Sequence, residues 1–223
     1  MNMLDIFRRA CGAGAQFTGI QALFQRPGGK LVSGPESGML SPCEGMVQEI
    51  GLVNTQQPIA GKPILAKPRL LDLKALLGNT EAAGLAEDGE YITIYLAPWH
   101  LNYVLFPFSG TCTVCRYLPG RCLPLFLCQG SEVKNERLVT CIDTEQGFPA
   151  AVIMIGSFLV SSLTAVCSAG ENYRLGDHLG TFGLGSTVVV VTPPGRVGFK
   201  VQPGDKLTPG ELIAVFRETT DER

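Results

Sequence analysis

Apolar and polar residues follow one another in short runs along most of the chain, and this pattern is typical of β-strands joined by turns. The segment 91–96 alternates strictly, with isoleucine or leucine at every second position. Glycine and proline residues are spread between the runs, where they favour turns. The strands predicted on this basis are residues 46–53, 91–96, 137–142, 150–155 and 188–191.

Two short segments show helical spacing instead. Near the N-terminus, Leu4, Phe7 and Cys11 form one apolar stripe, with Arg8 and Arg9 on the other face. This helix either packs on the domain or lies on a bilayer surface with its arginines toward lipid phosphates. Residues 71–77 predict a second short helix that ends at a glycine cap.

These elements indicate a mainly β protein with a minor α+β character. We expect twisted antiparallel sheets in one compact domain with short peripheral helices. The expected boundaries are a helical or irregular N-terminal segment over residues 1–39 and a β domain over residues 40–223. The uncharged segment 148–170 is long enough to span a bilayer, but its proline, glycine and serine residues and β-branched clusters favour buried strands.

Composition narrows the classes of function. The formal net charge is −2, so no electrostatic case for nucleic-acid binding exists. No secretory signal precedes the first helix, and we therefore expect a cytoplasmic protein, with peripheral membrane contact left open. For the same reason the eight cysteines are expected to be reduced rather than paired in disulfides.

Four of these cysteines raise the question of a metal site. One interpretation is a four-thiolate metal site formed by Cys112, Cys115, Cys122 and Cys128, but the second C-x-x-C of a zinc ribbon is missing. Residues 111–117 also predict a strand, in which positions three apart point to opposite faces. We therefore expect ordinary buried thiols and no metal.

The most reactive-looking stretch is Leu184-Gly185-Ser186-Thr187, directly before a valine run. A serine hydroxyl can attack the carbonyl that precedes it, and glycine tolerates the strained backbone that this needs. The resulting ester can then eliminate, which breaks the chain and leaves a ketone at the new N-terminus. The alternative is that Gly-Ser-Thr before a strand is simply a turn.

Several further segments support the first interpretation because they match one family in the right order. Residues 41–45 (SPCEG) resemble S-P-x-D-G, and residues 67–78 resemble K-G-x-x-Y-x-L-x-x-L-L-G. Residues 95–98 and Pro107 resemble the two ends of Y-L-x-P-x-D-Y-H-R-x-H-x-P, and residues 135–137 and 155–157 resemble N-E-R and V-G-A. Residues 176–187 resemble G-x-E-x-G-x-F-x-x-G-S-T. Together they resemble the phosphatidylserine decarboxylase family from about residue 40 to the end.

The resemblance implies a carboxy-lyase of phospholipid biosynthesis with a pyruvoyl cofactor made by self-cleavage. Ser186 would be the pyruvoyl precursor and Gly185 the new C-terminus of the larger fragment. The implied substrate is phosphatidylserine or another amino-acid-like amine. The resemblance also suggests a homodimer and peripheral contact with a membrane.

The departures from the family pattern concern its acid–base residues. Glu44 stands at the family's aspartate, and Asn102 and Leu105 stand at its two histidines. Leucine cannot accept a proton and asparagine does not titrate near neutral pH, so the serine lacks its usual base. The two histidines of the chain, His100 and His178, fall inside matched motifs and are candidate substitute bases. The alternative is a degenerate homologue that stays uncleaved and binds a lipid headgroup or a protein partner.

Overall fold

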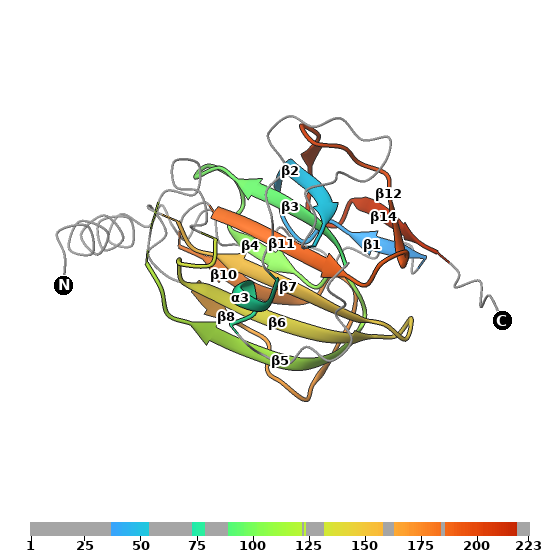
Figure 1. The fold of residues 1–223 in the computed structure, drawn as a ribbon, viewed down its shortest axis with the longest axis horizontal. Helices are drawn as coiled ribbons and strands as arrows, with labels where there is room; N and C mark the ends of the chain where they lie inside the picture. The colour runs from blue at the N-terminus through green and yellow to red at the C-terminus, as the bar shows by residue number, and fades with distance from the viewer. Residues whose placement is uncertain are drawn as a thin grey trace.

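The fold was analysed in a computed structural model, which describes residues 37–53, 73–78, 89–121, 123, 132–157, 163–183 and 186–217. Fourteen strands and one helix are defined in these ranges (Figure 1). The first strands and the helix are β1 (Gly38–Leu40), β2 (Gly45–Leu52), α3 (Leu73–Leu76), β3 (Glu90–Leu96), β4 (Tyr103–Leu105), β5 (Gly110–Leu118) and β6 (Arg137–Thr144). The remaining strands are β7 (Pro149–Ile155), β8 (Leu163–Ala165), β9 (Asn172–Tyr173), β10 (His178–Phe182), β11 (Ser186–Thr192), β12 (Val197–Phe199), β13 (Lys206–Leu207) and β14 (Leu212–Phe216).

Three sheets are built from these strands, and all of their strand pairs are antiparallel. The large sheet has eight strands in the order β13-β2-β3-β11-β7-β6-β5-β9. The two small sheets have the orders β1-β14-β12 and β4-β10-β8. The predicted mainly β class is therefore confirmed.

Strand β11 lies in the middle of the large sheet, between β3 and β7. Its register joins Ser186 to Leu96 and Thr187 to Ile155. All seven residues of β11 are buried, as a continuous run of valines requires when both faces of a strand are covered.

Two hydrophobic cores lie on opposite faces of the large sheet. Val188 and Val190 point into the larger one, which we call the main core; it also contains residues of both small sheets, such as Leu179 and Ile213. Val189 lies between them in sequence and points into the second core, which α3 covers. Strand alternation thus assigns even-numbered residues of β11 to the main core and odd-numbered ones to the second core.

The predicted helix over residues 71–77 is observed as the single turn α3, and Gly78 follows it with φ = +67°, as expected of a glycine cap. The buried guanidinium of Arg137 anchors this turn to the large sheet. Its Nε donates to the carbonyl oxygen of Leu76 (2.6 Å) and its Nη2 to that of Ala75 (2.8 Å). Its Nη1 donates to the carbonyls of Val133 and Asn135, both at 3.0 Å.

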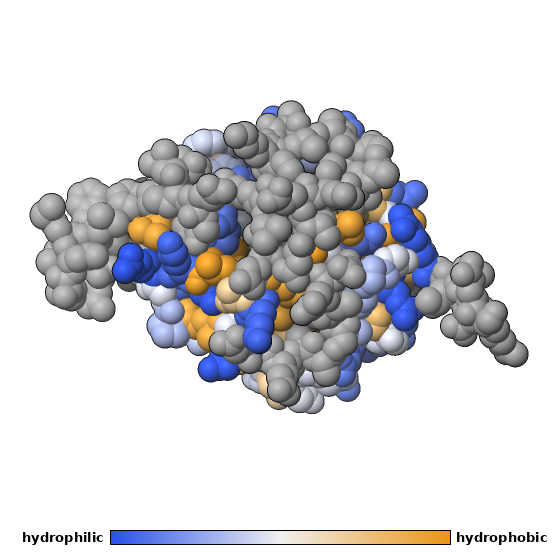
Figure 2. Space-filling view, in the orientation of Figure 1, coloured by the Kyte–Doolittle hydropathy of each residue, from blue (hydrophilic) through white to orange (hydrophobic). Residues whose placement is uncertain are grey.

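The remaining predictions concern the N-terminal helix and the uncharged segment 148–170. The expected N-terminal helix lies outside the described residues. Within the uncharged segment 148–170, strands β7 and β8 are found in the described parts. The described part of the chain contains no helix of the length and apolar character that a membrane span needs. On the face shown in Figure 2, the coloured residues include orange apolar groups interspersed with blue hydrophilic ones.

Candidate functional site

Ser186 is the first residue of β11 and is almost fully buried, with 2% of its surface exposed. It shares the parity of Val188, so its side chain faces the main core. Its Oγ is buried and has no hydrogen-bond partner among the described residues. Buried hydroxyls are normally hydrogen-bonded, and an exception at a matched motif suggests a use other than stability. Leu184 and Gly185 lie outside the described residues.

Three matched motif segments meet beside this serine. The backbone N–H of Leu105 donates to the carbonyl of Pro42 (2.7 Å), which joins segment 101–107 to segment 41–45. On the other side, the N–H of Phe182 donates to the carbonyl of Asn102 (2.8 Å). Because β10 runs toward Ser186, these bonds bring residues far apart in the sequence to one end of the large sheet.

Glu44 lies in a turn directly before β2. Its Oε2 accepts a hydrogen bond from the backbone N–H of Leu101 at 2.9 Å. The adjacent Gly45 lies so close to β3 that an added Cβ would stand 2.6 Å from the carbonyl oxygen of Tyr95. Since Tyr95 precedes Leu96, the partner of Ser186, Glu44 lies directly before β2, the strand next but one to β11, at the same end of the sheet as the serine.

Cys43 precedes Glu44 and is fully buried. Burial raises the pKa of its thiol strongly, and the neighbouring Glu44 carboxylate adds to this effect. The thiol therefore stays protonated at neutral pH and is a poor nucleophile.

Asn102 and Leu105 stand at the family's two histidine positions; Asn102 directly precedes β4, and Leu105 is the last residue of that strand. Val104 belongs to the main core, so Asn102, two residues earlier and fully buried, shares the face that Ser186 looks toward. Leu105 has the opposite parity and pairs across the sheet with His178. The structure thus brings Asn102, rather than Leu105, to the side of the serine.

His100 lies in the turn after β3, next to the exposed Trp99. The backbone N–H of Ala97 donates to its Nδ1 at 3.1 Å. A neutral imidazole has one acceptor nitrogen, and in His100 this hydrogen bond occupies it. The proton of the neutral ring is therefore assigned to Nε2 from its partner.

His178 has the opposite arrangement. Its Nε2 lies 3.1 Å from the carbonyl oxygen of Gly180, which can only accept, so Nε2 donates and Nδ1 carries the lone pair. The ring meets Tyr103 edge to face at a centroid distance of 6.3 Å. Val104 on β4 points into the main core, so the neighbouring Tyr103 and the imidazole that contacts it lie on the outer face of the small sheet. The structure does not bring His178 to the face occupied by Ser186.

The cysteine hypothesis rested on a premise that the structure corrects. Cys112 and Cys115 were expected on opposite faces of a strand, but the register of β5 shifts between Cys112 and Val114. Both thiols consequently face the main core, and they are joined there by Cys167. Cys122 and Cys128 lie outside the described residues. Within the described ranges, no three histidine, cysteine or acidic side chains are grouped to hold a metal ion.

Two features of this region escaped the sequence reasoning. The orphaned Oγ of Ser186 depends on the surroundings of the residue, which no motif encodes. The approach of Cys167 to Cys115 joins positions 52 residues apart, and nothing in the sequence links them.

Comparison with known proteins places these observations in a family. The family model of phosphatidylserine decarboxylase matches residues 19–215. The phosphatidylserine decarboxylase proenzyme of Psychrobacter arcticus is 30% identical over 206 residues, which cover 83% of this chain and 72% of that protein. The proenzyme of Alcanivorax borkumensis is 31% identical over 209 residues, covering 83% and 68%. The proenzyme of Methylococcus capsulatus is 27% identical over 228 residues, covering 90% and 77%. A match of this extent, together with the motif segments gathered around Ser186, shows that the chain belongs to the phosphatidylserine decarboxylase family.

Proposed function

We propose that this chain is a self-processing phosphatidylserine decarboxylase in which Ser186 is the precursor of the pyruvoyl group. The observation that carries this proposal is the buried, unpartnered Oγ at the Gly-Ser bond that matches the family's cleavage motif. A buried hydroxyl without a partner lowers the free energy of unfolding by about 1–3 kcal/mol. A serine with a purely structural role would regain this free energy through a hydrogen bond. Processing would remove the hydroxyl, so this cost falls only on the uncleaved chain.

The orphaned oxygen also fits the implied prosthetic group, because conversion of Ser186 would leave a carbonyl within a water-poor core. When present, the pyruvoyl group supplies the carbonyl that engages the substrate amine and takes up the electron pair left by carbon dioxide. The surrounding residues of this chain exclude water, since Leu96 and Val188 beside the serine are fully buried. A dry site strengthens every charge interaction made within it.

Glu44 is the side chain that we propose as proton acceptor for Ser186 during processing. Neither histidine favours this role: the acceptor nitrogen of His100 is occupied by Ala97, and His178 lies on the outer face of β10. The carboxylate of Glu44 uses one oxygen for the N–H of Leu101 and has a second oxygen for another donor. Its longer side chain, compared with the family's aspartate, reaches further along the sheet.

A second candidate function is supported by the two histidine positions. With Asn102 and Leu105 in place of titratable residues, an uncleaved homologue that binds a phospholipid headgroup or a protein partner is the alternative. The two candidates differ in one measurable property, the integrity of the chain.

The test is the mass of the purified protein under denaturing conditions. The proposal expects fragments 1–185 and 186–223, with the smaller fragment reacting with hydroxylamine as a ketone. Ser186→Ala should give one uncleaved mass. Thr192→Val is the matched control, because Thr192 lies on the same strand and also has a buried, unpartnered hydroxyl; it should cleave like the wild type. An uncleaved wild-type chain would refute the pyruvoyl proposal and favour the second candidate.

Glu44→Gln tests the proton acceptor separately. It keeps the shape and the hydrogen bond from Leu101 but removes the basic carboxylate. Loss of a general base slows a reaction by about 100-fold or more, so fragment formation should slow to that extent. His100→Gln and His178→Gln should process at near wild-type rates. Normal processing in Glu44→Gln, with a loss in either histidine variant, would reassign the base.

A phospholipid substrate also requires contact with a bilayer, and we propose that the turn after β3 makes it. Trp99 is 72% exposed and lies three residues beyond Leu96, the partner of Ser186. Tryptophan prefers the membrane interface because its ring is both apolar and polar. Trp99→Ala should weaken co-sedimentation with phosphatidylserine vesicles, whereas Tyr117→Ala, on β5 three strands away from β11, should not. Equal loss in both variants would contradict this placement.

The expected homodimer remains a separate proposal, to be measured by light scattering.

A further inference from the structure

Three thiols gather between the large sheet and the small sheet β4-β10-β8, at a distance from the serine site along the strands. The thiol of Cys167 donates to the Sγ of Cys115 across 3.5 Å, and the thiol of Cys115 donates to the carbonyl of Cys167 at 3.3 Å. Cys112 is the third member and donates to the carbonyl of Val114 at 3.4 Å. We call these three residues the thiol cluster.

The bulge in β5 creates this cluster. Cys112 pairs with Ile142 and Cys115 pairs with Thr140, so residues three apart share one face of the strand. Cys167 lies two residues after the end of β8, and its backbone N–H donates to the carbonyl of Leu179 at 3.4 Å. Its sulfur also lies 4.0 Å from the Oγ1 of Thr140.

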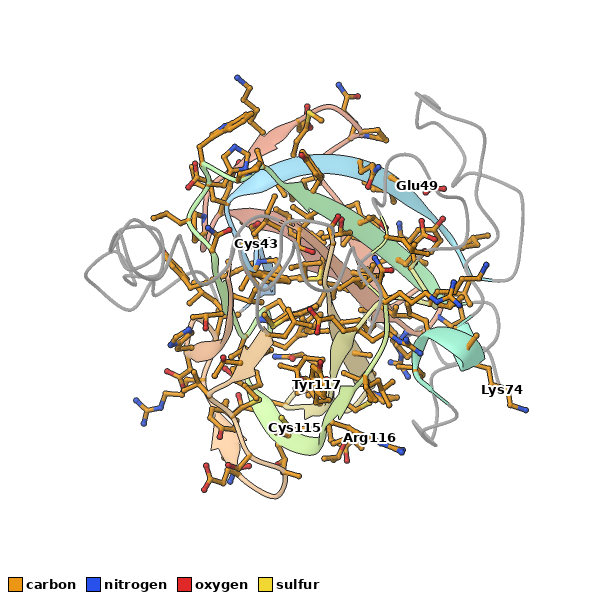
Figure 3. All side chains as sticks on the ribbon, turned by 90° about the vertical axis from the view of Figure 1, so that its left-hand side faces the viewer. Cys43, Glu49, Lys74, Cys115, Arg116 and Tyr117 are labelled. Atoms are coloured by element: carbon orange, nitrogen blue, oxygen red, sulfur yellow. The ribbon has the colours of Figure 1, made fainter. Side chains whose placement is uncertain are left out.

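We propose that Cys115 and Cys167 form a reversible disulfide that joins the small sheet β4-β10-β8 to the large sheet. A disulfide needs its sulfurs at about 2.05 Å, so the two sulfur atoms, now 3.5 Å apart, must approach by about 1.5 Å. Cys115 lies on β5, whose edge neighbour is the two-residue strand β9, and Figure 3 shows it beside Arg116 and Tyr117. Cys115 is partly exposed, so a small oxidant can reach it.

The oxidant class is a peroxide, and the step balances with it. Hydrogen peroxide oxidises the sulfur of Cys115 to a sulfenic acid and is itself reduced to water. The sulfur of Cys167 then displaces the hydroxyl, which leaves as a second water with the proton of the Cys167 thiol. Two thiols and one peroxide thus give one disulfide and two waters. A dithiol reductant reverses the reaction by exchange.

The thiol cluster also sets the speed of this reaction. Hydrogen bonding with Cys112 and burial raise the pKa of Cys167 to about 11, and hydrogen bonding with Cys167 raises the pKa of Cys115 further still. Thiolates, not thiols, react with peroxides. Oxidation of the Cys115–Cys167 pair should therefore be slow at pH 7 and become faster as the pH rises toward 10, whereas hydrogen bonding with Cys167 lowers the pKa of the third thiol, Cys112. Such a pair resists stray oxidation and responds to sustained peroxide.

The experiment uses the full-length protein, reduced and then treated with hydrogen peroxide. Remaining thiols are blocked with N-ethylmaleimide, and the digested protein is mapped by mass spectrometry. The proposal expects an intramolecular link between Cys115 and Cys167 that dithiothreitol removes, and an upward shift of several degrees in the melting temperature. Links to Cys112 only, links between chains, or complete blocking of all thiols would each overturn it.

Two variants control this test. Cys115→Ala must abolish the link. Cys141→Ala is the matched control, because Cys141 lies next to Thr140 on β6 but points into the second core. This variant must retain the link between Cys115 and Cys167. Because no step involves Ser186, the outcome does not depend on whether the chain processes itself.

Discussion

Two buried serines allow the reasoning about the site to be tested through stability alone. Ser41 is fully buried and Ser186 is 2% exposed. The Oγ of Ser41 donates to the carbonyl of Cys43 at 2.8 Å, whereas the Oγ of Ser186 has no partner. The same substitution, serine to alanine, should therefore have opposite effects at the two positions.

The expected magnitudes follow from the hydrogen bonds. In Ser186→Ala the chain no longer buries an unsatisfied hydroxyl, and we expect a gain of about 1 kcal/mol in the free energy of unfolding. In Ser41→Ala a hydrogen bond is lost, and we expect a loss of about 1 kcal/mol. For a chain of this size each kcal/mol shifts the melting temperature by about 2–4 °C. The two variants should therefore differ by about 4–8 °C.

Thermal unfolding followed by circular dichroism is a suitable assay when the reference chain and every variant also carry Glu44→Gln, which slows the processing proposed above, and when mass shows that each sample is uncut. Thr192→Val extends the comparison, since it removes another unpartnered hydroxyl at the far end of β11 and should also stabilise the chain. A loss of stability in Ser186→Ala equal to that in Ser41→Ala would show that Ser186 is hydrogen-bonded. The argument that its hydroxyl is reserved for chemistry would then fail.

Further predictions concern the architecture around the site. Arg137→Met should destabilise the chain by about 3 kcal/mol or more in urea unfolding, because four carbonyl bonds are lost, whereas Arg116→Met at an exposed position should change little. Gly180→Ala should lower the melting temperature, since its Cβ would stand 2.7 Å from the carbonyl oxygen of Thr164; an unchanged melting temperature would contradict this close approach. Burial raises the pKa of Glu90 above its ordinary 4.5, so the folded chain binds this proton more tightly and loses stability as pH rises from 4.5 through the folded-state pKa. Glu90→Gln should flatten that part of the pH–stability curve, and an unchanged curve would refute the assignment.

Most of the fold was predicted from strand alternation and from the positions of turn residues. The valine run 188–191 required cover on both faces, and β11 is indeed the central strand. Gly78 predicted where the helical turn ends, because the left-handed backbone conformation at that position favours glycine. The order of the strands in the sheets could not be predicted in this way, because it depends on contacts between segments far apart in the sequence.

The candidate site was less accessible to sequence reasoning. Motif spacing pointed to Ser186 and Glu44 as candidates. Whether a histidine can act as a base depends also on its hydrogen-bond partners, which motif spacing does not give. Ala97 and Gly180 determine the tautomers of His100 and His178, and neither role can be recognised from sequence spacing. The sequence did not predict the bulge in β5 either. Its one extra residue reverses the face of every side chain that follows it.

The segment that follows Ser186 is interwoven with the rest of the chain. Residues 186–217 supply the central strand of the large sheet (β11), its edge strand β13, and two of the three strands of a small sheet (β12 and β14). A break before Ser186 would therefore leave two peptides that complement each other as a split protein does, held by ladder hydrogen bonds and by both cores. Gel filtration would show an unchanged particle, and only a denaturant would separate the halves. Expressed as two separate polypeptides, the same halves should reassemble only by folding together.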